Sequence, residues 1–214
     1  MDLKEAKALA RRSMGDKRYE HTLNVKKMAV KLAKLHGADP DQAALAALLH
    51  DCAKERPKEE LLQIIRDNAI IAENAENRPS PVWHGICAAI LARTQWGVTD
   101  EAVLSAVACH TTGKPGMSTL DKIIFLADMT SAERDFPGVE ELRRLACRDL
   151  DLAMIEALDQ TIRFVKQGKK EVDPKFTWIM PSRRQTSVEN ERKSICPMQF
   201  EKFEFLRNNG TSRA

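Results

Sequence analysis

The chain has 214 residues, 43% of them hydrophobic and 30% charged, which fits one globular domain or one domain with a tail. We expect no membrane span and no signal peptide, because no apolar run approaches the roughly 18 residues that a span needs and the N-terminus alternates charged residues. The net charge of +3 equals the excess of seven basic over four acidic residues within residues 181–214, so the first 180 residues are formally neutral and give no reason to expect nucleic-acid binding.

Two helices are predicted at the start of the chain. Asp2 is placed to cap the first, which runs to about residue 14 before Gly15. Asp16 is placed to cap the second, which runs to Leu35 before Gly37.

His21 is the first candidate site residue. It shares one face of the second helix with apolar side chains at helical spacing, so it lies on the stripe that faces the core and not on the lysine-rich outer face. A histidine there is either a hydrogen-bonded core residue or a metal ligand. The apolar members of the stripe are Val25, Met28, Leu32 and Leu35.

A His-Asp pair follows the most apolar helix of the chain. This helix begins at Pro40, is apolar on nearly every side, and is therefore expected to be buried. His50 and Asp51 come at its end, and if the helix continues through Lys54 the three side chains point into one small region. An imidazole and a carboxylate suit a divalent metal, and an ammonium group one turn away suits an anionic ligand of that metal. A chance dipeptide is the alternative, so the pair needs support from the rest of the chain.

A third histidine falls at the start of a helix. Residues 57–67 are predicted to be an amphipathic helix and residues 68–81 an irregular connection. Ser80 and Pro81 then signal a new helix, with His84 in its first turn. The free amides and the positive dipole end of that turn favour an anion beside His84.

A fourth histidine ends a helix. Gly97 stops the preceding helix, and Thr99 is placed to cap the next one, which is apolar until His110. His110 therefore lies at the mouth of a buried helix, beside the hydroxyl of Thr111. The glycines that follow are too few and wrongly spaced for a Walker phosphate loop, so no such loop is expected.

Asp128 is the second candidate carboxylate. Ser118 and Asp121 form a capping box for a helix that ends near residue 129, and Asp128 follows an apolar run within it. If this carboxylate is buried, it needs a cation, a metal or strong hydrogen-bond donors; a solvent-facing position is the alternative.

The rest of the chain continues the helical pattern. A loop is predicted over residues 131–138, and helices over 139–147 and 149–167. No stretch has convincing strand periodicity and no internal repeat is present, so we expect an all-α fold.

Residues 181–214 differ from the rest in composition. They begin polar and basic and end with an apolar cluster that includes Phe200, Phe203 and Leu206. We expect a globular domain over residues 1–180 and a flexible tail over residues 181–214. The alternative is a short docking helix in the tail, for a partner protein or for a second copy of the chain in a homodimer.

The cysteines indicate the cellular compartment. There are five, far apart and mostly inside apolar helical stretches, with no Cys-x-x-Cys pair. Their odd number fits reduced thiols, so we expect a cytoplasmic protein. They are Cys52, Cys87, Cys109, Cys147 and Cys196.

Taken in order, the candidate residues follow the pattern His…His-Asp…His…His…Asp. They are His21, His50, Asp51, His84, His110 and Asp128. This pattern resembles that of the HD-domain metal-dependent phosphohydrolases, whose fold is a helical bundle with a metal site in its core. The local context looks like the bacterial symmetrical bis(5′-nucleosyl)-tetraphosphatases of HD type, over roughly residues 5–180. The motifs that carry this resemblance are Arg18–Val25, Ala47–Lys54, Trp83-His84-Gly85, His110–Gly113, and Ala127-Asp128 with Arg134–Gly138.

The resemblance implies a metal-dependent hydrolase. Its reaction would be the attack of a metal-bound water on a phosphate of diadenosine tetraphosphate, giving two ADP. His84 and His110 would either ligate a second metal, with Asp51 as the bridge, or contact the substrate phosphates. The implied ligands of the first metal, iron or alternatively manganese, are His21, His50, Asp51 and Asp128.

Polar side chains near these ligands are the implied substrate contacts. Asp51 and Lys54 are the expected catalytic residues, with Lys54 neutralising the charge of a phosphate. Arg18, Arg134 and Thr111 are further candidates for polyphosphate binding. No general acid is required if the leaving group is an ADP phosphate, because the metal and Lys54 can stabilise its charge.

Several alternatives stay open. Arg18 could pair with Glu20 or Glu55 instead of a phosphate, and Thr111 could merely end a helix. The substrate could be another nucleotide, such as a guanosine polyphosphate, a deoxynucleotide or a phosphomonoester, because the shared ligands do not read the base. The chain could also be a nucleotide sensor or an RNA-associated module without turnover. Residues 171–174, just after the last predicted helix, are a candidate for closing over the nucleoside.

Overall fold

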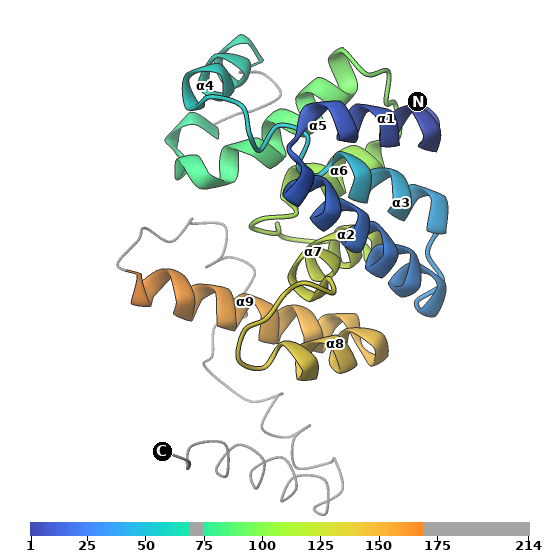
Figure 1. Cartoon of the computed structure of the whole chain (residues 1–214). Helices are drawn as coiled ribbons and strands as arrows, with labels where there is room; N and C mark the ends of the chain where they lie inside the picture. Colours follow the sequence, from blue (N-terminus) through green and yellow to red (C-terminus); the bar gives the residue numbers. More distant parts are fainter. Residues whose placement is uncertain (69–74, 169–214) are drawn as a thin grey trace, which may run out of the picture. The chain divides into compact units, whose positions relative to one another are not determined.

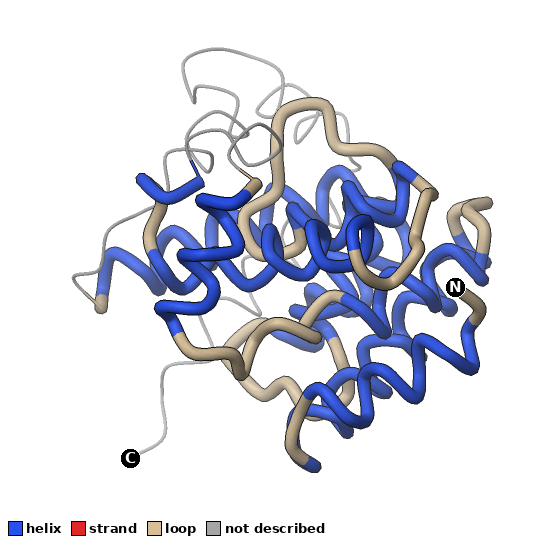
Figure 2. Tube along the Cα trace, turned by 90° about the horizontal axis from the view of Figure 1, so that it is seen from above, coloured by secondary structure: helices blue, strands red, loops and turns tan. Residues whose placement is uncertain are grey.

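The computed structural model describes residues 1–68 and 75–168, and this part of the chain consists of helices and loops (Figures 1 and 2). These residues contain no strand, so the expected all-α fold is confirmed. Within them, no helix is both long and apolar enough to cross a membrane. Residues 171–174, residues 181–214 and Cys196 lie outside the described residues, so the domain end, the tail and the homodimer stay predictions.

Three helices begin the chain: α1 (Leu3–Ser13), α2 (Asp16–Leu35) and α3 (Pro40–Leu49). The capping box at the start of α1 confirms the predicted first cap. The predicted cap of α2 is wrong by one residue, because Gly15 is the N-cap and Asp16 is already inside the helix. The Asp16 carboxylate pairs with a nearby arginine at 2.6 Å instead of capping amide groups.

The chain leaves α3 by tight turns. His50 is the C-cap of this helix, and the amides of Cys52 and Lys54 bond carbonyls three residues earlier, at 3.1 and 2.9 Å. Bonds of this kind wind the backbone more tightly than an α-helix does. The interpretation that the helix continues through Lys54 is therefore wrong, and helical spacing is not what brings Lys54 to the site.

The middle of the chain supplies two helices that line the site, α5 and α6. The elements are α4 (Lys58–Asp67), the 3-10 turns η1 (Ala75–Asn77) and η2 (Ser80–Val82), α5 (Trp83–Thr94) and α6 (Glu101–Cys109). His84 lies in the first turn of α5, as expected. The predicted cap Thr99 is wrong, because α6 begins one residue later than expected. Asp100 is the cap, and its Oδ1 accepts hydrogen bonds from the second and third amides of the helix at 2.9 and 3.2 Å.

Three helices end the described part: α7 (Thr119–Thr130), α8 (Val139–Arg148) and α9 (Leu150–Gln167). The capping box of Ser118 and Asp121 at the start of α7 is present as predicted. Figure 1 shows α8 and α9 as neighbours below α7, and both helices contact it. The loop between α7 and α8 is therefore held between packed helices.

α3 and α6 form the middle of the core. α3 packs against α2, α6 and α7, and α6 also packs against α5 and α7. Each fully buried leucine in these helices stabilises the fold by about 1.5–3 kcal/mol. The C-termini of α3 and α6, which carry the His50-Asp51 pair and His110, are therefore fixed by the core. The buried residues of α3 are Ala43, Ala44, Ala46, Ala47, Leu48 and Leu49.

Candidate metal centre

The candidate ligands come from five helices and meet in one place. His21 belongs to α2, His84 to α5 and Asp128 to α7. The other three follow the ends of α3 and α6. Asp51 and three of the four histidines of this cluster are buried. The set is His21, His50, Asp51, His84, His110 and Asp128.

Asp51 lies at the centre of the cluster. Its Oδ1 is 3.2 Å from His84 Nε2 and 3.7 Å from His110 Nε2. Its Oδ2 is 3.6 Å from His50 Nε2 and 3.9 Å from His21 Nε2. The two oxygens of one carboxylate therefore face two different pairs of histidines.

Among the described residues, two groups have ligand atoms that all lie within 4.8 Å of one another, as a metal ion requires. Both groups contain Asp51. Asp128 adjoins the first group, because its Oδ1 is 3.1 Å from His21 Nε2. The groups are His21-His50-Asp51 and Asp51-His84-His110.

Backbone carbonyls fix the protonation of three of the histidines. The Nδ1 atoms of His50, His84 and His110 lie 2.7, 2.9 and 2.7 Å from carbonyl oxygens three residues earlier in the chain. A carbonyl can only accept, so each Nδ1 carries the proton and each Nε2 presents a lone pair to the cluster. Metal-binding histidines usually have this second-shell partner.

The inward nitrogens of these histidines carry no protons, and His84 Nε2 has the Lys54 ammonium as a donor at 3.1 Å. His50 Nε2 is buried and has no hydrogen-bond partner among the described residues. His84 Nε2 and His110 Nε2 lie 3.1 Å apart, although both present lone pairs. A buried acceptor without a donor costs free energy, and a cation between the lone pairs and Asp51 would remove that cost. The donor set therefore fits a divalent transition metal.

The pKa values favour the ligand forms of these groups. Burial lowers the pKa of His50 and of His84 to about 4, although Asp51 partly offsets it. Burial alone would raise the pKa of Asp51, but the surrounding histidines outweigh it and hold the pKa well below its ordinary value. At neutral pH the two histidines are uncharged and Asp51 is ionised, which are the forms that bind metals.

Three cationic side chains border the cluster. Arg18 Nη1 is 2.6 Å from Asp51 Oδ2, and the guanidinium of Arg134 pairs with Asp128. The alternative pairing of Arg18 with Glu55 is also present, at 3.2 Å. Arg18 and Arg134 therefore lie beside the acidic candidate ligands, each already bound to a carboxylate, and their predicted contact with a polyphosphate stays a prediction.

Lys54 reaches the cluster from the turns after α3. Its Nζ lies 3.1 Å from His84 Nε2. Burial lowers the pKa of Lys54, although Asp51 and Asp128 partly oppose this. A half-buried ammonium group beside the ligands is available to an anion that enters the site.

Glu133 is a site residue that the sequence did not reveal. It lies in a loop rich in charged residues, and no spacing pattern distinguishes it from them. Its Oε1 pairs with His21 Nδ1, and its Oε2 accepts a hydrogen bond from Asn24 at 2.8 Å. Burial would raise the pKa of Glu133, but the hydrogen bonds from His21 and Ser131 lower it to about 2.

Gly85 is the second residue whose role emerges only in the structure. A Cβ atom at this position would lie 2.9 Å from His110 Cε1, so the close approach of α5 to His110 needs a glycine. The sequence showed the motif His84-Gly85, but it did not show why a glycine is needed after His84. The fifth histidine, His36, lies outside the site and contacts the Ala146 carbonyl at 2.8 Å.

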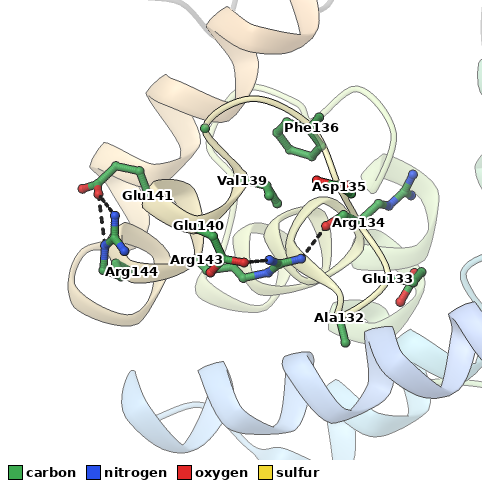
Figure 3. Close-up of a pocket in the computed structure, with 11 residues that line it drawn as sticks. Ala132, Glu133, Arg134, Asp135, Phe136, Val139, Glu140, Glu141, Arg143 and Arg144 are labelled. Atoms are coloured by element: carbon green, nitrogen blue, oxygen red, sulfur yellow. Dashed lines mark hydrogen bonds and ion pairs between the residues drawn. The ribbon is translucent and has the colours of Figure 1, made fainter. Parts of the chain in front are cut away.

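A small cavity of about 210 Å³ opens beside the cluster. Thr111 lines it, and the Oγ1 of Thr111 is buried with no hydrogen-bond partner among the described residues. A larger hollow of about 510 Å³ lies over the loop after α7 and the start of α8 (Figure 3). Of the two, only the small cavity reaches the ligands. Its lining is His110, Thr111, Phe125, Asp128, Met129, Arg134, Phe136 and Thr161.

Comparisons with known proteins identify the family and the fold. The HD domain family matches residues 18–133. The symmetrical bis(5′-nucleosyl)-tetraphosphatase of Bacillus subtilis (strain 168) is 39% identical over 184 residues, which cover 84% of this chain and 98% of that protein. The protein of the same name from Halalkalibacterium halodurans is 41% identical over 174 residues, covering 81% and 92%. A crystal structure of a predicted HD superfamily hydrolase involved in NAD metabolism from Clostridium acetobutylicum has a TM-score of 0.77 and 36% identity, and the match covers 83% of this chain and 94% of that chain.

Proposed function

The chain belongs to the HD-domain family of symmetrical bis(5′-nucleosyl)-tetraphosphatases, and from this premise we propose that it hydrolyses diadenosine tetraphosphate to two ADP with the help of a divalent metal. The observation that carries the proposal is the cluster of four histidines and two aspartates centred on Asp51. Its ligand types and lone-pair directions match a hydrolytic metal site, while a protein that only binds nucleotides needs no such set.

The residues assigned to the metal divide into two groups. Asp51 would serve both, as a bridge between a first ion and a second. When bound, the metal supplies a Lewis acid for the phosphate oxygens and lowers the pKa of a water molecule. The nitrogen and oxygen donors suit iron, which we propose, and manganese, which is the alternative. The first group is His21, His50, Asp51 and Asp128, and the second is Asp51, His84 and His110.

The cationic side chains would bind the tetraphosphate. The Lys54 ammonium lies 3.1 Å from His84 Nε2 and would donate to a phosphate oxygen next to the bond that breaks. Arg134 and Arg18 would exchange part of their carboxylate contacts for phosphate contacts as the substrate enters. These charges stabilise the leaving ADP, so no side chain has to protonate it.

The small cavity would hold one end of the substrate. Its volume of about 210 Å³ is below the roughly 300–1,000 Å³ of pockets for whole ligands, so it suits a base or a ribose and not a dinucleotide. Phe125, Met129 and Phe136 provide apolar walls, and the unpartnered hydroxyl of Thr111 can bond a polar group of the ligand.

We also propose that the protein works in the cytoplasm. The four cysteines within the described residues form no disulfide, and three of them are buried. Burial raises the pKa of these three thiols to about 12, so they stay protonated and unreactive. Such thiols fit a reducing compartment. The three are Cys52, Cys87 and Cys109.

Product analysis tests the proposed reaction. Purified protein loaded with iron or manganese is incubated with diadenosine tetraphosphate, the nucleotides are separated by chromatography, and the metal content of the same sample is measured. We expect ADP as the only product. ATP together with AMP would refute symmetrical cleavage. No turnover by a metal-loaded sample would favour another nucleotide substrate, or a sensor that binds without hydrolysis.

A further inference from the structure

The loop between α7 and α8 presents two side chains to the metal centre. Glu133 pairs with Nδ1 of His21, which belongs to α2. Arg134 pairs with the carboxylate of Asp128, and its Nε donates to the Asp128 carbonyl at 2.9 Å. The loop therefore contacts two candidate ligands of the first metal, His21 and Asp128.

Glu133 and Asp128 contact the two ring nitrogens of His21, and a neutral ring carries only one proton. Two carboxylates compete for it, because Asp128 Oδ1 lies 3.1 Å from Nε2 on the opposite side of the ring from Glu133. If the proton stays on Nδ1 beside Glu133, the Nε2 lone pair is free for a metal. If the proton moves to Nε2, that ligand atom is blocked.

The Glu133 carboxylate is itself held in place. Besides His21, it accepts hydrogen bonds from Asn24 Nδ2 at 2.8 Å and from Ser131 Oγ at 2.7 Å. A carboxylate fixed by several donors keeps one orientation and stays ionised, so it is a better acceptor for the His21 proton than a free side chain would be.

Arg143 of α8 holds the loop that carries Glu133. Its guanidinium donates to three main-chain carbonyls of one short segment: Thr130 at 3.0 Å, Ser131 at 2.8 Å and Arg134 at 2.7 Å. The side chain is only 18% exposed and also pairs with Glu140. Figure 3 shows the contacts with the Arg134 carbonyl and with Glu140. A planar guanidinium can reach several carbonyls at once, which an ammonium group cannot do from one position.

We infer that Glu133 and Arg143 are positioning residues of the metal centre, Glu133 by keeping the Nε2 lone pair of His21 free and Arg143 by fixing the loop that carries Glu133. This inference rests on the metal site of the proposed function. Glu133 contacts His21, and Arg143 contacts the main chain of the loop that carries Glu133, so both are assigned an action through His21. Arg144, the next residue of α8, is a matched control, because it is 66% exposed and pairs with Glu141 on its own helix (Figure 3).

The first test is the affinity for Mn²⁺, measured by titration of the metal-free full-length protein. We expect Glu133→Ala to weaken binding at the first site about 10- to 100-fold, as loss of a second-shell partner commonly does. Glu133→Gln keeps an acceptor but loses the charge, so this variant should bind Mn²⁺ more tightly than Glu133→Ala and less tightly than the wild type. Arg143→Ala should weaken binding in the same direction, whereas Arg144→Ala should leave it unchanged. Melting temperatures of all variants identify any that fail to fold.

Two further readouts separate positioning from a general structural role. Nitrogen chemical shifts of His21 in the metal-free protein, recorded where the imidazole is neutral, should report the proton on Nδ1 in the wild type and a shift toward Nε2 in Glu133→Ala. The double variant Glu133→Ala/Arg143→Ala should bind Mn²⁺ about as weakly as Glu133→Ala alone, because Arg143 acts through Glu133.

The outcomes distinguish this inference from the proposed function. If the wild type binds Mn²⁺ and Glu133→Ala binds it equally well with an unchanged His21 proton, the inference is refuted while the proposed function stands. Additive losses in the double variant would refute the role of Arg143. A wild type that binds no Mn²⁺, Fe²⁺ or other divalent metal would refute both. Failure to cleave diadenosine tetraphosphate with metal bound would refute only the proposed substrate.

Discussion

At the scale of single residues, the site depends on one shared carboxylate. Asp51 faces four histidine nitrogens at 3.2 to 3.9 Å and also pairs with Arg18. An aspartate in this position can bind two ions at once, and it also compensates the positive charge of Arg18 when no ion is bound. Each of the four histidines belongs to one of the two groups of candidate ligands among the described residues.

Asp51→Ala should therefore abolish metal retention and hydrolysis together. The helical fold should persist, because the core leucines and alanines of α3 stay buried. Metal analysis, hydrolysis of diadenosine tetraphosphate and circular dichroism check the three parts of this prediction. Asp51→Asn is the matched variant, which keeps the shape but loses the charge, and it should also lose metal. Full activity in either variant would remove Asp51 from the site.

Lys54→Ala should keep the metal and weaken turnover. A charge-assisted hydrogen bond to a phosphate contributes about 1.5–3 kcal/mol, so kcat/KM for diadenosine tetraphosphate should fall about 10- to 150-fold. Lys58→Ala is the control, since the Lys58 ammonium lies over the Trp83 ring, 5.7 Å from its centre, and not at the ligands. Equal kinetics in the Lys54 variant and the wild type would show that Lys54 makes no phosphate contact.

At the scale of elements, the ends of helices build the site. α3 and α6 each end at a histidine whose Nδ1 bonds a carbonyl of the helix that it terminates. The last turn of a helix has carbonyls without helical partners, and here two of them orient candidate metal ligands. His84 makes the same kind of contact with η2, because its Nδ1 lies 2.9 Å from the Pro81 carbonyl oxygen.

Gly85→Ala tests how closely α5 must approach α6. In an ordinary helix this change would stabilise by about 1 kcal/mol, because alanine has the higher helix propensity. Here the new Cβ would lie 2.9 Å from the His110 ring and displace it. We expect weaker binding at the second group, seen as a lower Mn²⁺ affinity or stoichiometry in a titration. An unchanged titration would show that the His110 ring moves aside without consequence.

At the scale of the whole molecule, the site is a buried polar centre inside an apolar bundle. His50, Asp51, His84 and His110 are buried where α3, α5 and α6 meet, at positions that apolar side chains occupy elsewhere in the core. Such a centre costs free energy unless its members are paired, so stability and metal binding are linked.

The metal-free protein should lose stability as the pH falls from 7 to 5. His50 and His84 have a folded-state pKa of about 4, below the value of about 6.5 in the unfolded chain. Between these pKa values the unfolded state binds more protons than the folded state. Each histidine should therefore lower the free energy of unfolding by roughly 2 kcal/mol between pH 7 and pH 5. The pKa of His21 is raised and opposes this loss, because its protonated form is favoured in the folded state.

Denaturant unfolding at several pH values, with a chelator present, measures this dependence. His84→Asn removes one of the two buried imidazoles and should reduce the loss of stability between pH 7 and pH 5. His36→Asn, which changes a histidine outside the site, should leave the dependence close to that of the wild type. A flat profile in the wild type would contradict the buried neutral state of the two histidines.

The sequence by itself determined the all-α fold, nearly all helix boundaries and the identity of the candidate ligands. Helix boundaries depend on local signals, namely caps, prolines, glycines and apolar periodicity. These signals act over a few residues, so they can be recognised from the sequence alone. Where they failed, at the starts of α2 and α6, the error was one residue: Gly15 is the N-cap of α2 without a side-chain hydrogen bond, and Asp100 takes the capping position of α6 next to Thr99. The error at the end of α3 was larger, because the turns of 3-10 type that follow this helix have no distinct pattern in the sequence.

Only the tertiary structure decided how the ligands are shared and supported. The contact of Glu133 with His21 spans 112 residues, and it exists because α2 packs against α7 and Arg143 of α8 holds the intervening loop. The position of Asp51 between two histidine pairs likewise depends on the packing of four helices, α2, α3, α5 and α6. Distances of 3 to 4 Å between side chains from separate helices are set by the core, and no local pattern in the sequence encodes them.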